Sequence, residues 1–364
     1  MEGIVDFVLR DLLTQIGGLS QCTTEFVRVT DKLNPPHVFY KYCPELKNGG
    51  QTAAGVPVWV QLLGSSPETL SENADLAIEL GAPGIDLNFG CPAKTVNRHD
   101  GGATLLKTPE RLFHIISAVR RSARGRVPVS AKVRLGFDHK NFCLDIAQAV
   151  AAGGAHRLTI HARTKLEGYQ PPAHWEYIAQ MAQAIPQVPV VANGDIWSVE
   201  DYWEMVRVTG IHDVALGRGL IARPDLGRQI RQSLEGHPVL GTQQGLKGLL
   251  GPEGHPSLGV QHSLEGHPSP ETQLQSKTPP RQTENPTPKT LPELSWEQVR
   301  QQILPRFVSM SSEFRNSDFA LARLKQWTRL LARTYPQART EFDQIKALKS
   351  LDQLDGALRP DKLP

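Results

Sequence analysis

The chain has 364 residues, of which 39% are hydrophobic and 21% charged, and its formal net charge is +3 at pH 7. This composition excludes a wholly disordered chain and a histone-like polycation, although it allows a local basic patch that meets nucleic acid. At about 150 residues per domain, the length predicts two to three domains or one large barrel with an appendage.

Neither a membrane protein nor a secreted one is expected. No stretch approaches the roughly 18 uninterrupted apolar residues of a membrane span, and the chain does not open with a basic segment followed by an apolar one. The four cysteines, at positions 22, 43, 91 and 143, lie far apart without a CxxC pair, which argues against a zinc ribbon or an iron-sulfur cluster. We therefore expect a reduced, cytoplasmic protein without a metal site.

Residues 1–232 alternate short β-branched runs with longer helical ones, a pattern typical of a parallel sheet with crossover helices. Helices are predicted around residues 5–13, 67–80, 109–121 and 142–152. The predicted strands lie at residues 22–27, 58–62, 84–87, 129–133, 158–160, 188–192 and 214–216. This order predicts an α/β fold, a (β/α)8 TIM barrel that lacks its first strand, because the chain passes from residues 1–3 directly into the first helix.

The composition changes to Gly, Pro, Gln, Ser and Thr over residues 233–293, as in a flexible linker. The hexapeptide SLEGHP at residues 233–238 recurs at 263–268, and its GHP core recurs at 254–256. The repeats bring three histidines that suggest a metal site, but no acidic or cysteine co-ligands keep a fixed spacing with them. A local duplication in a segment without a fold is the favoured interpretation.

Helical periodicity returns over residues 294–364 and predicts an all-helical bundle. An apolar stripe runs through residues 319–332, and the basic residues Arg323, Lys325, Arg329 and Arg333 lie between its positions. We therefore expect a basic outer face on this helix. Taken alone, that face suits a solvated surface and an RNA-binding surface equally well.

The most informative stretch is DLNFGCPAKTVNRHDGG, residues 86–102, which follows a predicted strand. The C-terminal ends of barrel strands carry the active site, so Asn88 and Cys91 would face a ligand. A lone cysteine is more often a buried residue that packs in the core than a catalytic one. Cys91, however, lies in a polar loop bounded by Gly and Pro, and an ordinary thiol with a pKa of about 8.5 is mostly protonated at neutral pH and able to donate a proton.

Other predicted strands also end in polar residues of the kind that bind ligands. An isolated lysine inside a strand requires an anionic or strongly polar partner. The glycine-containing turns ANGDI and GRG follow the last two strands, where barrels of this type bind phosphate. The polar strand-end residues are Gln61, Lys132, Arg134, His161 and Arg163, and Arg218 in the GRG turn is available to an anion.

The motifs LNFGCPAKTVN, KVRLG, HART, ANGDI and GRG, in this order, resemble the tRNA-dihydrouridine synthases. The segments TEFVRV, CPELKN, GGATLLK and LARLKQW are most similar to the bacterial C-type subfamily. The resemblance covers residues 1–231 and 296–338. It implies an FMN-dependent barrel with a C-terminal helical domain that binds tRNA, NADPH or NADH as reductant, and no obligate protein partner. The implied reaction is the reduction of a uridine in the D-loop of tRNA, and the resemblance to the C-type subfamily implies position 16.

The resemblance also implies roles for single residues. Cys91 would protonate C5 of the uridine while the flavin gives a hydride to C6, and Asn88 would position the uracil. Cofactor-binding roles fall on Met1, Glu2, Gln61, Lys132, His161, Asn193, Gly194, Asp195, Gly217 and Arg218. Contacts with substrate or RNA fall on Lys94, Arg98, Arg134, Arg163, Arg323, Lys325 and Arg329.

Two other functions remain open. One is a flavin barrel that acts on a free small molecule, for which the basic helical appendage has no use. The other is an N-terminally truncated homologue that binds tRNA with impaired catalysis, since a barrel without one strand exposes two edges and would bind flavin poorly. A start site assigned too far downstream would explain the same missing strand.

Overall fold

The computed structural model describes residues 3–98, 100–236, 291–354 and 358. One compact unit combines Met1–Arg231 with Glu293–Pro364, and a second comprises Gln232–Pro292. Met1, Glu2 and the three histidines of the repeats, His237, His255 and His267, lie outside the described residues. The division into a barrel at 1–232, a linker at 233–293 and a helical domain at 294–364 stays a prediction. The fold below is that of the first unit.

A parallel sheet forms the centre of this unit, and it confirms the predicted α/β class. The order is β1-β3-β4-β5-β6-β7, and β2 pairs with the far end of β3. All six residues of β3 are buried, as expected where helices cover a parallel sheet. The strands are β1 (Cys22–Thr23), β2 (Val27–Arg28), β3 (Val58–Leu63), β4 (Ile85–Asn88), β5 (Val129–Arg134), β6 (Arg157–His161) and β7 (Val190–Asn193).

The first predicted strand, residues 22–27, is two short strands instead of one. The Thr24 hydroxyl accepts a hydrogen bond from the backbone N–H of Gln61 at 3.0 Å, so a side chain takes the place of the backbone carbonyl that would continue the strand pairing. The last predicted strand, 214–216, is reduced to a single bridge between Ala192 and Val214. Among the described residues no pairing joins this segment to β1, and the curled sheet is therefore not closed by hydrogen bonds there.

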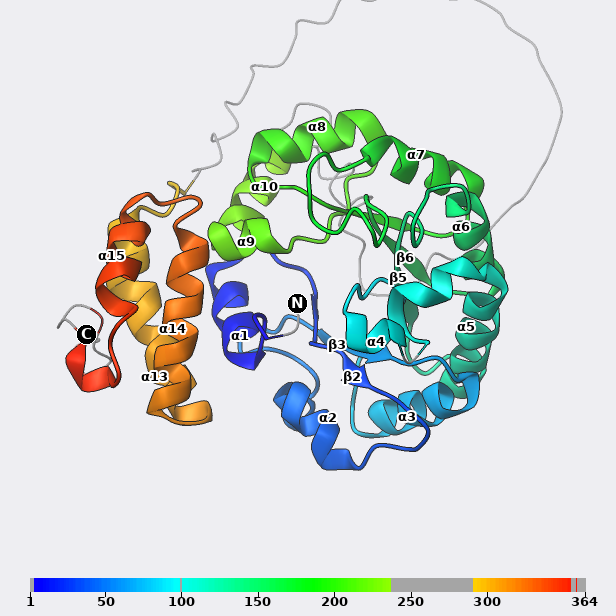
Figure 1. Cartoon of the computed structure of the whole chain (residues 1–364), viewed down its shortest axis with the longest axis horizontal. Helices are drawn as coiled ribbons and strands as arrows, with labels where there is room; N and C mark the ends of the chain where they lie inside the picture. Colours follow the sequence, from blue (N-terminus) through cyan, green and yellow to red (C-terminus); the bar gives the residue numbers. More distant parts are fainter. Residues whose placement is uncertain (1–2, 99, 237–290, 355–357, 359–364) are drawn as a thin grey trace, which may run out of the picture. The chain divides into compact units, whose positions relative to one another are not determined.

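The longer helices follow one another around the outside of the sheet, and the short helix at residues 94–98 lies inside that ring (Figure 1). Ser66 begins one of them by accepting a hydrogen bond from Thr69, and Ser198 and Asp201 form a capping box at another. None of the helices in the described part of the chain is long and apolar enough to span a membrane. The helices are α1 (Phe7–Ile16), α2 (Pro36–Tyr42), α3 (Pro67–Glu79), α4 (Lys94–Arg98), α5 (Pro109–Ala123), α6 (Cys143–Ala152), α7 (Trp175–Ala184), α8 (Val199–Thr209), α9 (Arg218–Ala222) and α10 (Leu226–Glu235), with 3-10 turns at Pro44–Asn48 and Gly102–Lys107.

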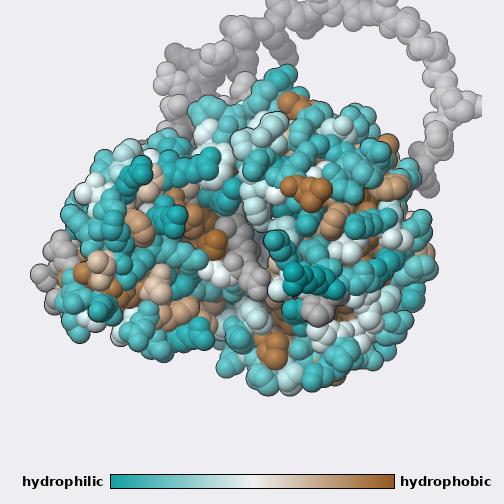
Figure 2. Space-filling view, viewed as in Figure 1, coloured by the Kyte–Doolittle hydropathy of each residue, from teal (hydrophilic) through white to brown (hydrophobic). Residues whose placement is uncertain are grey.

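The predicted C-terminal helical region is confirmed. Trp327 at its centre meets Phe307 edge to face with ring centroids 4.7 Å apart, and both are buried with Leu324. The face of the protein in Figure 2 is mostly hydrophilic, with hydrophobic residues in separate spots. The helical elements are α12 (Trp296–Gln298), a π-helical turn at Val299–Ile303, α13 (Leu304–Phe314), α14 (Ser317–Leu331), α15 (Gln337–Ile345) and a 3-10 turn at Leu351–Gln353.

The expectation of a basic outer face on α14 is wrong for Arg323, which is only 7% exposed. Its guanidinium donates to the Asp6 carboxylate at 3.0 Å and to the carbonyl oxygens of Gly3 and Ile4. The Lys325 ammonium is likewise held, by the carbonyl of Leu348 at 2.6 Å. Helix α14 therefore uses one cation to dock on the N-terminal part of the barrel, because that surface supplies a carboxylate and carbonyls as partners.

Candidate active site

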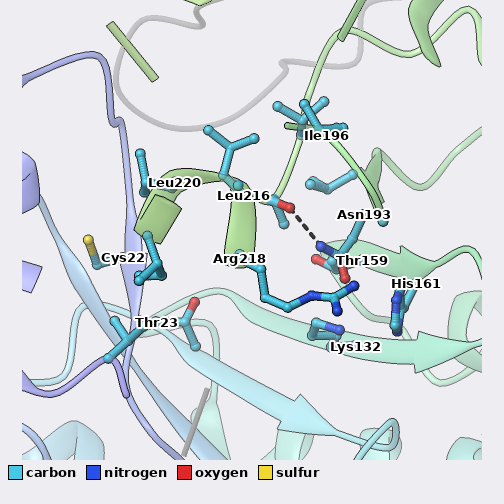
Figure 3. Close-up of a pocket in the computed structure, with 18 of the residues that line it drawn as sticks. Cys22, Thr23, Lys132, Thr159, His161, Asn193, Ile196, Leu216, Arg218 and Leu220 are labelled. Atoms are coloured by element: carbon cyan, nitrogen blue, oxygen red, sulfur yellow. Dashed lines mark hydrogen bonds between the residues drawn. The ribbon is translucent and has the colours of Figure 1, made fainter. Parts of the chain in front are cut away.

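A cavity of about 800 Å³ opens at the C-terminal ends of the strands, and this volume lies in the range that holds cofactor-sized ligands. Figure 3 shows that side chains from β5, β6, β7 and the start of α9 converge on it. The cavity is lined by the predicted residues Gln61, Asn88, Cys91, Lys132, Arg134, His161, Asn193, Gly194, Asp195, Gly217 and Arg218. The sequence prediction thus named residues from five strand ends that the fold brings together.

A chain of hydrogen bonds fixes the two amides on this wall. The Asn88 amide donates to Gln61 Oε1 at 2.7 Å, and the Gln61 amide donates in turn to Asp86 Oδ2 at 2.7 Å. Ser130 donates to the other oxygen of Asp86 at 2.5 Å. Burial raises the pKa of the Asp86 carboxyl, while the hydrogen bonds from Ser130 and Gln61 oppose that shift. Each of these two side-chain amides has a second N–H that these hydrogen bonds do not use and that a ligand can accept from.

Lys132 points from β5 into the cavity (Figure 3). The residue is half-buried, and no hydrogen bond or ion pair joins its ammonium to another of the described residues. Burial, assisted by the nearby Arg134 charge, lowers the pKa of Lys132 to about 8. An ammonium in such surroundings favours an anionic or strongly polar ligand, because the nearby Asp86 carboxylate compensates its charge only in part.

His161 ends β6 beside this lysine and is 6% exposed. Burial, together with Lys132, Arg134 and other cations, holds the pKa of His161 far below its usual range, so the imidazole is neutral. Arg134 is 2% exposed and donates to the carbonyls of Gly90 and Thr164 at 2.8 and 3.0 Å. The cavity wall is therefore cationic, and its histidine acts as a neutral hydrogen-bonding group.

The turns after β7 and before α9 are tied together at one end of the cavity. The Asn193 amide donates to the carbonyl of Ala215 at 2.7 Å. Arg218 donates to the Asp195 carboxylate at 3.2 Å. Gly219 is required here, because a Cβ at that position would lie 1.9 Å from the carbonyl oxygen of Ile196. The close approach of these backbones leaves the Arg218 guanidinium facing the cavity.

Cys91 lies in the loop after β4 and is 8% exposed. The backbone of this loop is held by Ala103 N–H and the Asn97 amide, which donate to the Cys91 carbonyl at 3.1 and 3.0 Å. Its side chain packs in a cluster with Phe26 and other apolar residues and lines the cavity. The thiol is thus presented to the cavity from a fixed loop.

Several predicted contact residues lie elsewhere. Lys94 and Arg98 are exposed on α4 and do not line the cavity, and Arg329 is exposed on α14. The Arg163 side chain is fully buried and forms an ion pair with Asp195, so it positions that carboxylate and offers RNA no exposed cation. Two cofactor residues expected at the N-terminus, Met1 and Glu2, lie outside the described residues.

Sequence reasoning missed two aromatic residues of the site. Tyr169 is 53% exposed, and its ring centroid lies 4.8 Å from the Arg218 guanidinium and 5.3 Å from that of Arg134. Trp197 follows β7 and also lines the cavity. Both follow the HART and ANGDI motifs within a few residues, and an aromatic residue in a loop at that edge of the sheet was the available signal.

The chain is similar to one protein family and to several known enzymes. The model of a family described as dihydrouridine synthase (Dus) matches residues 1–239. The tRNA-dihydrouridine(16) synthase of Pseudomonas syringae pv. tomato is 56% identical over 240 residues, which cover 66% of this chain and 75% of that protein. The enzyme of the same name from Aquipseudomonas alcaligenes is 42% identical, and the match covers 98% of this chain and 96% of that protein. The one from Neisseria meningitidis serogroup A is 40% identical, and the match covers 97% of this chain and 90% of that protein.

Proposed function

The chain belongs to the dihydrouridine synthase family, and we propose from this premise that it reduces the C5–C6 double bond of a uridine in the D-loop of tRNA. The family resemblance drawn from the motifs is thereby confirmed, and the family's enzymes are flavin-dependent oxidoreductases. We further propose FMN as the flavin and NADPH as the reductant. For the target we propose position 16, the position that the names of the relatives give. The single observation that supports this proposal most is the cavity in which Cys91, Asn88 and the unpartnered Lys132 meet.

The residues present fit a flavin mononucleotide. The cavity is large enough, Lys132 supplies a positive charge that Asp86 compensates only in part, and Gln61 offers an amide already held in one orientation by Asp86. Lys132 and Gln61 would hold the ring system, and Asn193, Gly194, Gly217 and Arg218 would hold the phosphate. When bound, the flavin supplies the hydride that C6 of the uracil receives.

Cys91 donates the proton that C5 of the uracil requires, and Asn88 holds the uracil beside it. General acids of this kind contribute about 10²- to 10⁴-fold to a rate. A stacked uridine cannot reach a cavity wall, so the nucleotide must be turned out of the tRNA at a cost of a few kcal/mol. Tyr169 offers an exposed ring at the mouth on which an unstacked base lies favourably.

The exposed basic residues serve the rest of the tRNA. Lys94 and Arg98 on α4 and Arg329 on α14 carry no structural hydrogen bond among the described residues, and they would contact phosphates. Charges of this kind hold a folded RNA in register without reading its bases. Recognition of position 16 would therefore depend on where these contacts place the tRNA over the cavity.

Two measurements on the purified full-length chain test the function. A visible-absorption scan, with mass analysis of the released chromophore, should identify FMN. Incubation with NADPH and an unmodified tRNA transcript should then yield dihydrouridine at position 16, while free uridine in a parallel reaction should stay unreduced. Turnover of free uridine at a comparable rate would instead favour a small-molecule oxidoreductase. Tight tRNA binding by the flavin-loaded protein without any product would favour a tRNA-binding homologue with impaired catalysis.

A further inference from the structure

Arg333 follows α14 in the helical region and lies directly over a ring of the barrel. Its guanidinium carbon is 3.4 Å from the centroid of the Trp197 indole, and its side chain is exposed to solvent over much of its surface. At this distance the guanidinium contacts the ring, and cation–π attraction adds to the contact. Arg333 does not itself line the cavity, whereas Trp197 does.

Trp197 connects Arg333 to the predicted phosphate-binding turn. The backbone N–H of Trp197 donates to Asp201 at 2.8 Å, so the start of α8 anchors this residue. Its ring centroid lies 5.3 Å from the guanidinium carbon of Arg218, which also lies 4.8 Å from the Tyr169 ring. The Arg218 side chain is therefore held by Trp197 and Tyr169 and by the carboxylate of Asp195.

The side chains around this turn carry more positive than negative charge, which favours the binding of an anion. Asp195 is the carboxylate that pairs with both Arg163 and Arg218, so a single acidic group faces two guanidinium groups. Burial lowers the pKa of Arg218; the Asp195 carboxylate opposes this shift, and the charges of Arg163 and Arg333 add to it. Arg163 is fixed by burial and by Asp195. Arg218 and Arg333 are held against the repulsion between these cations by the rings of Trp197 and Tyr169, and a bound phosphate would relieve it.

We propose that Arg333 is a positioning residue for the cofactor phosphate: stacked on Trp197, it fixes the indole against which Arg218 is held, and so makes phosphate affinity depend on the docking of the helical region. The inference rests on the proposed function, since it takes the phosphate of FMN as the anion. Helix α14 also contacts α9 directly, through a hydrogen bond of 2.9 Å from the Trp327 indole to the carbonyl of Ile221. The helical region is thus attached to the turn after β7 through Trp197, and to α9, the helix that begins at Arg218, through Ile221.

The test compares two flavins that differ only in the phosphate. The full-length chain, stripped of bound flavin, is titrated with FMN and with riboflavin while flavin fluorescence is followed. Arg333→Ala should bind FMN about five- to tenfold more weakly than the unaltered chain and bind riboflavin equally well, which corresponds to the loss of one cation–π contact of ordinary strength. Arg333→Lys should recover part of the loss. Arg339→Ala, a change at an exposed arginine of α15, is the matched control and should alter neither affinity.

A second comparison tests whether the effect passes through the indole. In a Trp197→Leu background, Arg333→Ala should cause no further loss of FMN affinity. An equal loss for both flavins in Arg333→Ala, an unchanged FMN affinity, or the same loss in the Trp197→Leu background would each overturn the proposal. An unaltered chain that binds neither flavin would instead refute the proposed function itself. Equal melting temperatures of Arg333→Ala and Arg339→Ala would show that the fold is intact in both.

Discussion

The C-terminal edge of the sheet and helix α14 each hold a basic side chain, Lys132 and Arg323, whose surroundings are opposite. At the sheet edge, the Lys132 ammonium lies in the cavity without a partner among the described residues. On α14, the Arg323 guanidinium is buried against a carboxylate and two carbonyls. The difference teaches that a cation's partners, and not its residue type, separate a binding role from a structural one.

The physical basis of this difference is the free energy of desolvation. Burying a charge is unfavourable unless hydrogen bonds or an opposite charge replace the lost water. Arg323 receives that compensation from the barrel, and it contributes to stability. Lys132 receives only a partial compensation, from the nearby Asp86 carboxylate, and its lowered pKa shows that burial outweighs it. A site that keeps such a group is a candidate for ligand binding, because the ligand supplies the missing partner.

The largest effect is expected at the thiol. Cys91→Ala should lower the rate of dihydrouridine formation at least about 100-fold, because C5 loses its proton donor, while flavin absorbance is retained. Product formation on a tRNA transcript under single turnover measures this loss. Cys143→Ala is the matched control, since Cys143 is buried in α6 and does not line the cavity. A Cys91→Ala rate close to that of the control would refute the assignment of the acid.

A large loss of stability is expected next, at the docked arginine. Arg323→Met should lower the free energy of unfolding by about 3 kcal/mol, because Asp6 and two carbonyls lose their donor in a buried setting. Urea denaturation measures this change, and Arg329→Met on the same helix should change it by less than about 0.5 kcal/mol. Equal effects of the two variants would remove the distinction between a docked and an exposed cation on α14.

The opposite pattern is expected for the lysine of the sheet edge. Lys132→Met should weaken flavin binding about tenfold without lowering the free energy of unfolding, since it removes a half-buried charge that Asp86 compensates only in part. Fluorescence titration and urea denaturation of the same preparation measure both quantities. Lys140→Met, which affects an ion pair with Glu167 outside the cavity, should leave flavin affinity unchanged. A loss of stability with unchanged affinity would place Lys132 among the structural cations.

The smallest effect is a dependence of stability on pH. The pKa of Lys132 is about 8 in the folded chain and 10.5 in its ordinary state, so between these values the unfolded chain binds more protons at this site. The contribution of this group to stability therefore rises as pH increases from about 8 to 10.5, while flavin affinity falls as the ammonium is lost. Urea denaturation of the flavin-free chain and of Lys132→Met across this pH range measures the contribution of Lys132 to the free energy of unfolding. A stability difference between the two that does not vary with pH would contradict the lowered pKa.

Local patterns in the sequence predicted the architecture well. The β-branched runs at β3 and β5 and the helices α3, α5 and α6 appear within a few residues of their predicted bounds. The side-chain period and the Pro and Gly boundaries that indicate these elements are local properties. The segment at 214–216 became only a bridge, because a run of three residues is a strand only where neighbours pair with it, and pairing is not encoded locally.

The sequence by itself determined the strand-end residues of the site, since parallel strands bring their C-terminal ends to one edge in any fold of this class. Only the tertiary structure decided which cations are free to bind. Arg323 meets Asp6 across more than 300 residues of chain, and Arg333 meets Trp197 across more than 130. Contacts between such distant positions leave no periodic trace in the sequence, because they arise when two independently patterned regions pack together.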